Sequence, residues 1–219
     1  MVTYEQLKKN DAVRAYISSA DDSLKTLGYT EHSFAHVCKV AEDAAWILSS
    51  VGYDEHTVEV AKIAGLLHDI GNLVNRSEHS QSGAVMAFRI LDKLGMPAED
   101  IATVVTAIGN HDEGTGVPVN AVAAALILAD KSDVRRTRVR NSDFSTFDIH
   151  DRVNYSVTSS ELSIGEDKRE ITLTRTIDTD ISPVMDYFEI FLGRMMLCRK
   201  AAEKLGMSFS LVINGQRII

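Results

Sequence analysis

Apolar residues recur every three or four positions over most of the first 140 residues, as on the buried side of an amphipathic helix. The spacing predicts one helix from the start of the chain to about Thr26, and another from an N-cap at Thr30 to about Ser50. Further helices are predicted over residues 54–69, 80–94, 97–109 and 120–134, with loops over residues 71–76 and 111–118. The last of these helices is apolar on most sides, so we expect it to be buried.

The pattern changes after about Ser142, where β-branched residues alternate with polar ones. Residues 153–164 and 169–177 predict a hairpin joined by the turn-like sequence GEDK. A long helix from Ser182-Pro183 to about Leu205 follows, then a strand that ends in an Asn214-Gly215 turn. We interpret the apolar side chains of that helix as core packing: Met185, Phe188, Phe191, Leu192, Met195 and Met196. The sequence therefore predicts a mainly α protein, with a helical bundle core over residues 1–142 and a small α+β appendage over residues 143–219.

Composition and charge narrow the class of protein. The 219-residue chain is 45% hydrophobic and 25% charged, which suits one compact core and argues against disorder. The net charge of -8 argues against a general nucleic-acid binder, but permits a local basic pocket for a small phosphorylated substrate. The start of the chain is polar and no apolar run approaches the ~20 residues of a membrane span, so we expect a cytoplasmic protein. Cys38 and Cys198 lack metal-type spacing and are interpreted as small buried residues.

The segment IAGLLHDIGN is the most informative about chemistry. It places the adjacent pair His68-Asp69 directly after an apolar run, at the predicted end of a buried helix. Burying an ionised carboxylate beside an imidazole is unfavourable unless a cation compensates it. Taken alone, the pair is better explained as two hydrogen-bonded polar residues at a helix end.

Two further residues shift the balance towards a metal. His36 shares a helix face with Val40 and Ile47, so its imidazole is predicted to point inward. Asp130 again follows a buried apolar run directly. Two imidazoles and two carboxylates from apolar faces of separate helices are hard to explain without a cation. Mixed nitrogen and oxygen donors suit Mn, Fe, Co, Ni or Zn better than Mg or Ca.

The order of these residues resembles a known family. His36 lies in HVCKVAEDA, the His68-Asp69 doublet in LLHDIGN and Asp130 in LILADKSD, and together they resemble the HD-domain superfamily of metal-dependent phosphohydrolases. The resemblance covers about residues 30 to 140. It implies an all-helical catalytic core in which these four residues ligate one divalent metal. It also implies that the metal activates water for attack on a phosphate ester.

Two more histidines extend the resemblance. His79 and His111 fall where the HD-GYP branch and related binuclear proteins place extra ligands, so a second metal could share Asp69. The chain departs from the HD-GYP pattern at Asn72, where that branch has lysine, and at Asn110, where it has the first of two histidines. These departures count against cyclic-di-GMP hydrolysis. The sequence leaves open whether the site holds one metal or two. It also leaves open whether His79 and His111 are metal ligands, substrate contacts in the pocket or surface residues.

The remaining histidines carry weaker signals. His32 lies one turn before His36 and is interpreted as a partly exposed residue at the helix start, with orientation of a metal ligand as the alternative. His56 and His150 lie in no comparable context, so both are predicted to be on the surface.

The segment KSDVRRTRVR, directly after Asp130, is basic. Lys131, Arg135, Arg136 and Arg138 are candidates to bind the substrate's phosphate, because guanidinium and ammonium groups donate charged hydrogen bonds to it. The alternative is a solvated face or ion pairs with surface acids, and the sequence favours neither.

The catalytic groups are less well defined by the sequence. Asp69 is expected to bridge or position the metal-activated water. Asp133, Asp112 and Glu113 are candidates for the general acid or base, and no spacing distinguishes them.

The leading hypothesis is a hydrolase that uses one or two divalent transition metals on a nucleotide or another small phosphorylated metabolite. One alternative is a metal-containing module that binds or senses a nucleotide without turnover, with Asn72 marking a lost catalytic group. A metal-free helical interaction domain and, with iron, an oxygenase are the others. We expect neither a nucleic-acid polymer nor a membrane as a partner, and the C-terminal part offers a surface for a homodimer.

Overall fold

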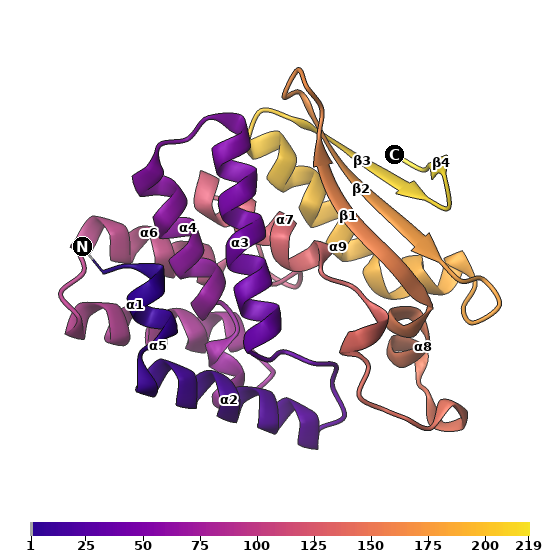
Figure 1. Cartoon of the computed structure of the whole chain (residues 1–219), viewed down its shortest axis with the longest axis horizontal. Coiled ribbons are helices and arrows are strands. Elements are labelled where there is room, and N and C mark those ends of the chain that lie inside the picture. The colour runs from indigo at the N-terminus through magenta and orange to yellow at the C-terminus, as the bar shows by residue number, and fades with distance from the viewer. Residues whose placement is uncertain (1) are drawn as a thin grey trace.

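A computed structural model describes residues 2–219 and shows a mainly helical protein with a small sheet at one side (Figure 1). The helical part contains α1 (Tyr4–Lys8), α2 (Asp11–Thr26), α3 (Phe34–Val51), α4 (Glu55–Leu67), α5 (His79–Lys93), α6 (Ala98–Gly109) and α7 (Ala121–Ser132). The C-terminal part contains α8 (Ile149–Ser156), β1 (Val157–Ile164), β2 (Glu170–Ile177), α9 (Val184–Lys204), β3 (Ser208–Ile213) and β4 (Gln216–Arg217). Short 3-10 turns lie at η1 (Ile70–Leu73), η2 (Arg136–Arg138) and η3 (Phe144–Thr146). The predicted fold class is confirmed.

Side-chain caps determine where the first helices begin. Asn10 accepts hydrogen bonds from the backbone of Ala12 and Val13, and so starts α2 after a break that the apolar spacing does not reveal. The single helix predicted up to Thr26 is therefore wrong. Ser33, rather than the predicted Thr30, caps α3. Asp54 caps α4 as expected.

Helix α7 is the centre of the core. It packs against α3, α4, α6 and α9, and its residues from Val122 to Ala129 are at most 2% exposed. Such a helix has no solvated face, which is why its sequence is apolar all round. The prediction of a buried helix is confirmed, and its C-terminal end delivers Asp130 and Lys131 to the interior.

Helices α3 and α4 cross at very short range. A Cβ atom on Gly65 would lie 2.6 Å from the Cα atom of Ala41, so only glycine allows this approach. The contact brings the first turn of α3, with His36, beside the end of α4, with His68.

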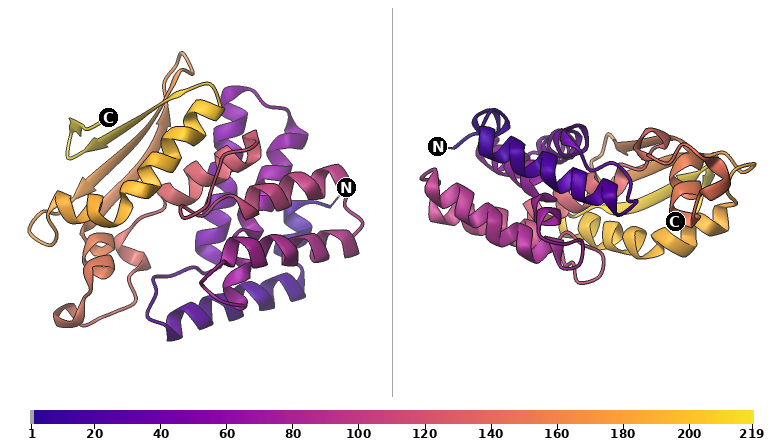
Figure 2. Two further views of the ribbon diagram at one scale, coloured as in Figure 1. Left: turned by 180° about the vertical axis from the view of Figure 1, so that it is seen from behind. Right: turned by 90° about the horizontal axis from the view of Figure 1, so that it is seen from below.

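The C-terminal part is an α+β unit with strand order β1-β2-β3-β4. The predicted hairpin forms antiparallel between β1 and β2, whereas β3 pairs with β2 in parallel, because α9 carries the chain back across one face of the sheet (Figure 2). One prediction is wrong here: residues 153–156, expected to begin a strand, are the last turn of α8.

The sheet also holds the end of α7. Arg175 on β2 donates to the carbonyl of Lys131 at 3.0 Å, and Ser160 on β1 donates to the carbonyl of Ser132 at 2.6 Å. These are last-turn carbonyls without helical partners, so the C-terminal part stabilises the helix end that carries Asp130. Within residues 2–219 no helix has the length and hydrophobicity needed to cross a membrane.

Candidate metal centre

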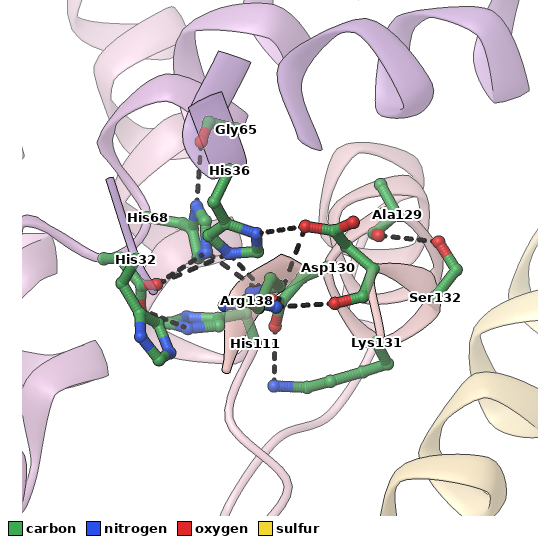
Figure 3. Close-up of polar contacts among 12 residues, drawn as sticks. His32, His36, Gly65, His68, His111, Ala129, Asp130, Lys131, Ser132 and Arg138 are labelled. Atoms are coloured by element: carbon green, nitrogen blue, oxygen red, sulfur yellow. Dashed lines mark hydrogen bonds and ion pairs between the residues drawn. The ribbon is translucent and has the colours of Figure 1, made fainter. Parts of the chain in front are cut away.

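The four predicted ligands converge in the interior. His36 comes from the first turn of α3, His68 and Asp69 follow the end of α4, and Asp130 lies in the last turn of α7 (Figure 3). His36 Nε2 is 3.6 Å from Asp69 Oδ2 and 3.5 Å from Asp130 Oδ1. His68 Nε2 is 3.3 Å and 3.7 Å from the same two oxygens. These four atoms form a first donor group.

A second donor group shares Asp69. Its other oxygen, Oδ1, is 3.5 Å from His79 Nε2 and 3.9 Å from His111 Nε2. The two Nε2 atoms are 3.2 Å apart. His79 and His111 are 4% and 1% exposed, so the surface-loop interpretation of them is wrong. The two oxygens of Asp69 thus face two separate sets of imidazoles.

All four imidazoles are oriented through their other nitrogen. Each Nδ1 lies within hydrogen-bond distance of an oxygen: Asp133 Oδ2 for His36 (2.7 Å), Gly65 O for His68 (2.8 Å), Arg76 O for His79 (3.1 Å) and Ile108 O for His111 (2.6 Å). Oxygen acceptors require the hydrogen to be on Nδ1, which leaves an Nε2 lone pair pointing into the site.

The residues fit a divalent metal. Donors about 2.1 Å from one tetrahedral ion lie about 3.4 Å apart, close to the separations in the first donor group. His36 and His68 are fully buried, and within residues 2–219 their Nε2 atoms have no hydrogen-bond partner. A buried polar atom without a partner is costly, and a bound cation would satisfy both nitrogens.

The electrostatics of the site also suit a cation. Burial opposes ionisation of Asp69, but the positive charge of His68 and the closeness of the His36 and His68 imidazoles outweigh it and hold the pKa of Asp69 well below its ordinary value. Burial acts to lower the pKa of His68, while the negative charges of Asp69 and Asp130 beside it raise the pKa to about 10. The buried carboxylates therefore need positive charge, which a divalent ion supplies without protonating its imidazole ligands.

The donor groups open into a cavity of about 470 Å³. Asp69, Asp130, His79 and His111 line its inner end. Four further residues of the helical part line it as well: Arg76, Glu113, Lys131 and Arg138. Residues from the segment before α3, from α8 with its N-cap, and from α9 complete the lining: Leu27, Gly28, Tyr29, Thr30, His32, Asp148, His150, Asp151, Asn154, Phe191 and Arg194. The C-terminal part thus builds part of the cavity wall.

Two of the four predicted phosphate-binding residues line this cavity. Lys131 Nζ is 2.6 Å from Asp130 Oδ2 and 2.9 Å from Glu113 Oε2. Arg138 is buried and donates to the backbone carbonyls of Asp133 and Glu31. The N–H groups of both side chains already donate to neighbouring residues. Lys131 and Arg138 therefore add positive charge to the cavity but few donors that are free to bind a ligand.

Arg135 and Arg136 are not among the residues that line the cavity. Arg135 donates to Asp133 at 2.8 Å. Arg136 donates to the carbonyl of Tyr155 at 2.7 Å and lies over the ring of that residue. Both guanidinium groups are thus engaged with neighbouring residues, and their role in phosphate binding stays a prediction.

The candidate acid-base groups also differ in whether they line the cavity. Asp133 is 2% exposed, does not line the cavity and lies 2.7 Å from His36 Nδ1, a placement that suits orienting that imidazole; its acid-base role stays a prediction. Glu113 lines the cavity, but although burial opposes its ionisation, the charges of Lys131 and Arg194 hold its pKa far below the usual range. A carboxylate so firmly ionised is unsuited to donate a proton.

Several cavity residues carry a weak signal in the sequence or none. Arg194 reaches the site from α9 and donates to Glu113 at 2.8 Å. His32 packs edge-on against His36, with ring centroids 5.6 Å apart, and lines the cavity. His150 is exposed as predicted, yet it lies at the cavity wall, because the unpredicted helix α8 places it there.

These features define a helical protein with a buried histidine and aspartate centre suited to divalent metal. Residues 33–140 match the family model of the HD domain, and the chain belongs to the HD-domain superfamily. The family match and the donor clusters support a metal-dependent phosphohydrolase in general terms.

The chain is also similar to individual proteins. Over 188 residues the chain is 26% identical to the uncharacterised protein MJ1020 of Methanocaldococcus jannaschii. This match covers 75% of this chain and 72% of that protein. This chain is also 33% identical to ribonuclease Y of Opitutus terrae over 112 residues, which are 51% of this chain but 20% of that enzyme. The solved structure of a predicted HD superfamily hydrolase from an uncultured Thermotogales bacterium is 25% identical, with a TM-score of 0.45, over 57% of this chain and 67% of that one.

Proposed function

We propose that the protein hydrolyses a phosphate ester of a small substrate, a nucleotide or another phosphorylated metabolite. The observation that carries the proposal is the placement of Asp69 at the inner end of the cavity, with one oxygen towards each donor group. A cavity of about 470 Å³ is in the size range of small-molecule sites. The net charge of -8 supports a small substrate rather than a nucleic-acid polymer.

The first donor group would hold one divalent metal through His36, His68, Asp69 and Asp130. His79 and His111 would hold a second, shared through Asp69. A divalent metal in such a site lowers the pKa of bound water to about 7 and neutralises charge on the phosphoryl oxygens.

The protein's own residues hold this arrangement in place. Asn72 donates to Asp69 Oδ1 at 3.0 Å and to the Asp69 carbonyl at 2.9 Å, and so fixes the carboxylate between the donor groups. Lys131 holds Asp130 Oδ2, which leaves Oδ1 free to face the two imidazoles. Asp112 Oδ1 lies 4.0 Å from His79 Nε2 and is the remaining candidate for the general acid or base.

Metal analysis of purified variants tests the site. Inductively coupled plasma mass spectrometry should find about two equivalents of a transition metal in the parent protein. His68→Ala should lose most of both metal equivalents, because it disturbs the first donor group and the shared Asp69. His79→Ala should keep about one metal equivalent. His56→Ala is the matched control, since His56 is half exposed, pairs with Asp100 and lies outside the cavity.

An activity panel then tests the reaction. Phosphomonoesters, cyclic nucleotides, nucleoside triphosphates and a short RNA should be offered with the metal found. Metal-dependent release of phosphate or of a nucleotide, lost in His68→Ala, is the expected result. No turnover of any of these by a fully loaded protein would contradict the proposal. Tight nucleotide binding without turnover would instead favour a sensing module.

A further inference from the structure

The cavity has an excess of acid until a metal is bound. Five acidic side chains (Asp69, Glu113, Asp130, Asp148 and Asp151) and four basic ones (Arg76, Lys131, Arg138 and Arg194) line it. One divalent ion therefore reverses the sign of the local charge, and only then does the cavity favour an anionic phosphate group.

Among these cations, Arg76 differs in its surroundings. Lys131, Arg138 and Arg194 each lie within 4 Å of a carboxylate. Within residues 2–219 no carboxylate lies that close to the Arg76 guanidinium, which donates to Asn72 Oδ1 at 3.3 Å and lies 5.7 Å from the ring centre of Tyr29. Most of its five N–H donors are therefore open to a ligand.

Arg76 is also linked to the second donor group on two sides. Its carbonyl lies 3.1 Å from His79 Nδ1 and orients that imidazole. Two hydrogen bonds in series, through Asn72, link its side chain to Asp69 Oδ1, the oxygen that faces His79 and His111. The guanidinium thus lies at the cavity wall near the second donor group.

We propose that Arg76 is the substrate-binding cation of this site and grips a phosphate oxygen. The inference rests on the proposed function and deepens it. Because Asn72 is short and donates to Asp69, Arg76 four residues later supplies positive charge that the side chain at position 72 does not. A guanidinium offers two parallel donors to two non-bridging oxygens of a phosphate.

Binding of inorganic phosphate to the metal-loaded protein tests the proposal without requiring turnover. Isothermal titration calorimetry should show that Arg76→Gln weakens phosphate binding by about tenfold or more, with unchanged metal content. Arg76→Lys should recover part of the loss, because charge returns without the paired donors. Arg89→Gln is the control, since Arg89 is exposed on α5 and lies outside the cavity, and it should bind phosphate like the parent.

Steady-state kinetics supply the second readout. With any phosphomonoester that the parent hydrolyses, Arg76→Gln should raise KM by a larger factor than it lowers kcat. Three results would each overturn the proposal. They are equal phosphate affinity in the parent and Arg76→Gln, no phosphate binding by the metal-loaded parent, and loss of metal from the variant. Phosphate binding that depends on Arg76 without hydrolysis of any ester would refute the proposed function alone. Hydrolysis that is indifferent to Arg76 would refute this inference alone.

Discussion

Gly65 lies at the crossing of α3 and α4, and its replacement by alanine is expected to destabilise the protein. In a helix interior, Gly→Ala normally stabilises by about 1 kcal/mol. Here the new methyl group would lie 2.6 Å from Ala41 Cα and 2.8 Å from Ala41 N, which are backbone atoms that cannot rotate away. Overpacking of this kind costs about 1–3 kcal/mol, and two rigid helices place it near the upper end. The net expectation is a loss of about 2 kcal/mol.

Gly193 on α9 is the matched control. It is also inside a helix, but no described atom lies within 4 Å of an ideal Cβ there, so Gly193→Ala should gain the full propensity term of about 1 kcal/mol. Scanning calorimetry of the chelator-treated proteins should show Tm about 4–8 °C lower for Gly65→Ala and about 2–4 °C higher for Gly193→Ala. Gly65→Ala should also bind metal more weakly, because separating α3 from α4 separates His36 from His68. A Tm increase in both variants would refute the packing argument.

Three further outcomes are expected. Asp133→Asn should weaken metal binding by about 10–100-fold in a chelator competition, because His36 loses the carboxylate that fixes its Nδ1 hydrogen; equal affinities would argue against this orienting role. Asn120→Ala removes the cap of α7 and should lower the free energy of unfolding by about 1 kcal/mol in urea titration, whereas an unchanged midpoint would show that the cap is dispensable. Burial raises the pKa of Cys198 to about 12, so only about one such thiol in ten thousand is ionised at pH 8. With Cys38→Ser as background, Ellman's reagent should therefore label Cys198 rapidly only in denaturant, and fast labelling of the native protein would contradict the burial.

Local physics explains what the sequence by itself determined. The period of apolar residues located α3 to α7 to within a few residues, and Asp54 marked its helix start, because periodicity and caps are properties of neighbouring residues. His68, Asp69 and Asp130 could be found because a polar or charged group directly after a buried apolar run is unfavourable without compensation, and His36 because it shares a helix face with apolar residues. Their role as metal ligands remains a prediction.

The tertiary structure decided everything that depends on contacts between distant segments. The apolar pattern of α9 correctly placed Phe191 and Met195 in the core, but the same interpretation is wrong for Met185, Leu192 and Met196, which are 74%, 52% and 38% exposed. Only the packing of α9 on α7 decides which of these side chains is buried and brings Arg194 beside Glu113. In the basic run after Asp130, five cations look equivalent in sequence, but Lys131 and Arg138 line the cavity whereas Arg135, Arg136 and Arg140 do not. Parallel pairing of β3 with β2 likewise has no local signature, because it depends on how α9 returns across the sheet. Residue spacing encodes which face of an element is buried, whereas the partner of that face follows from the free energy of packing the whole chain.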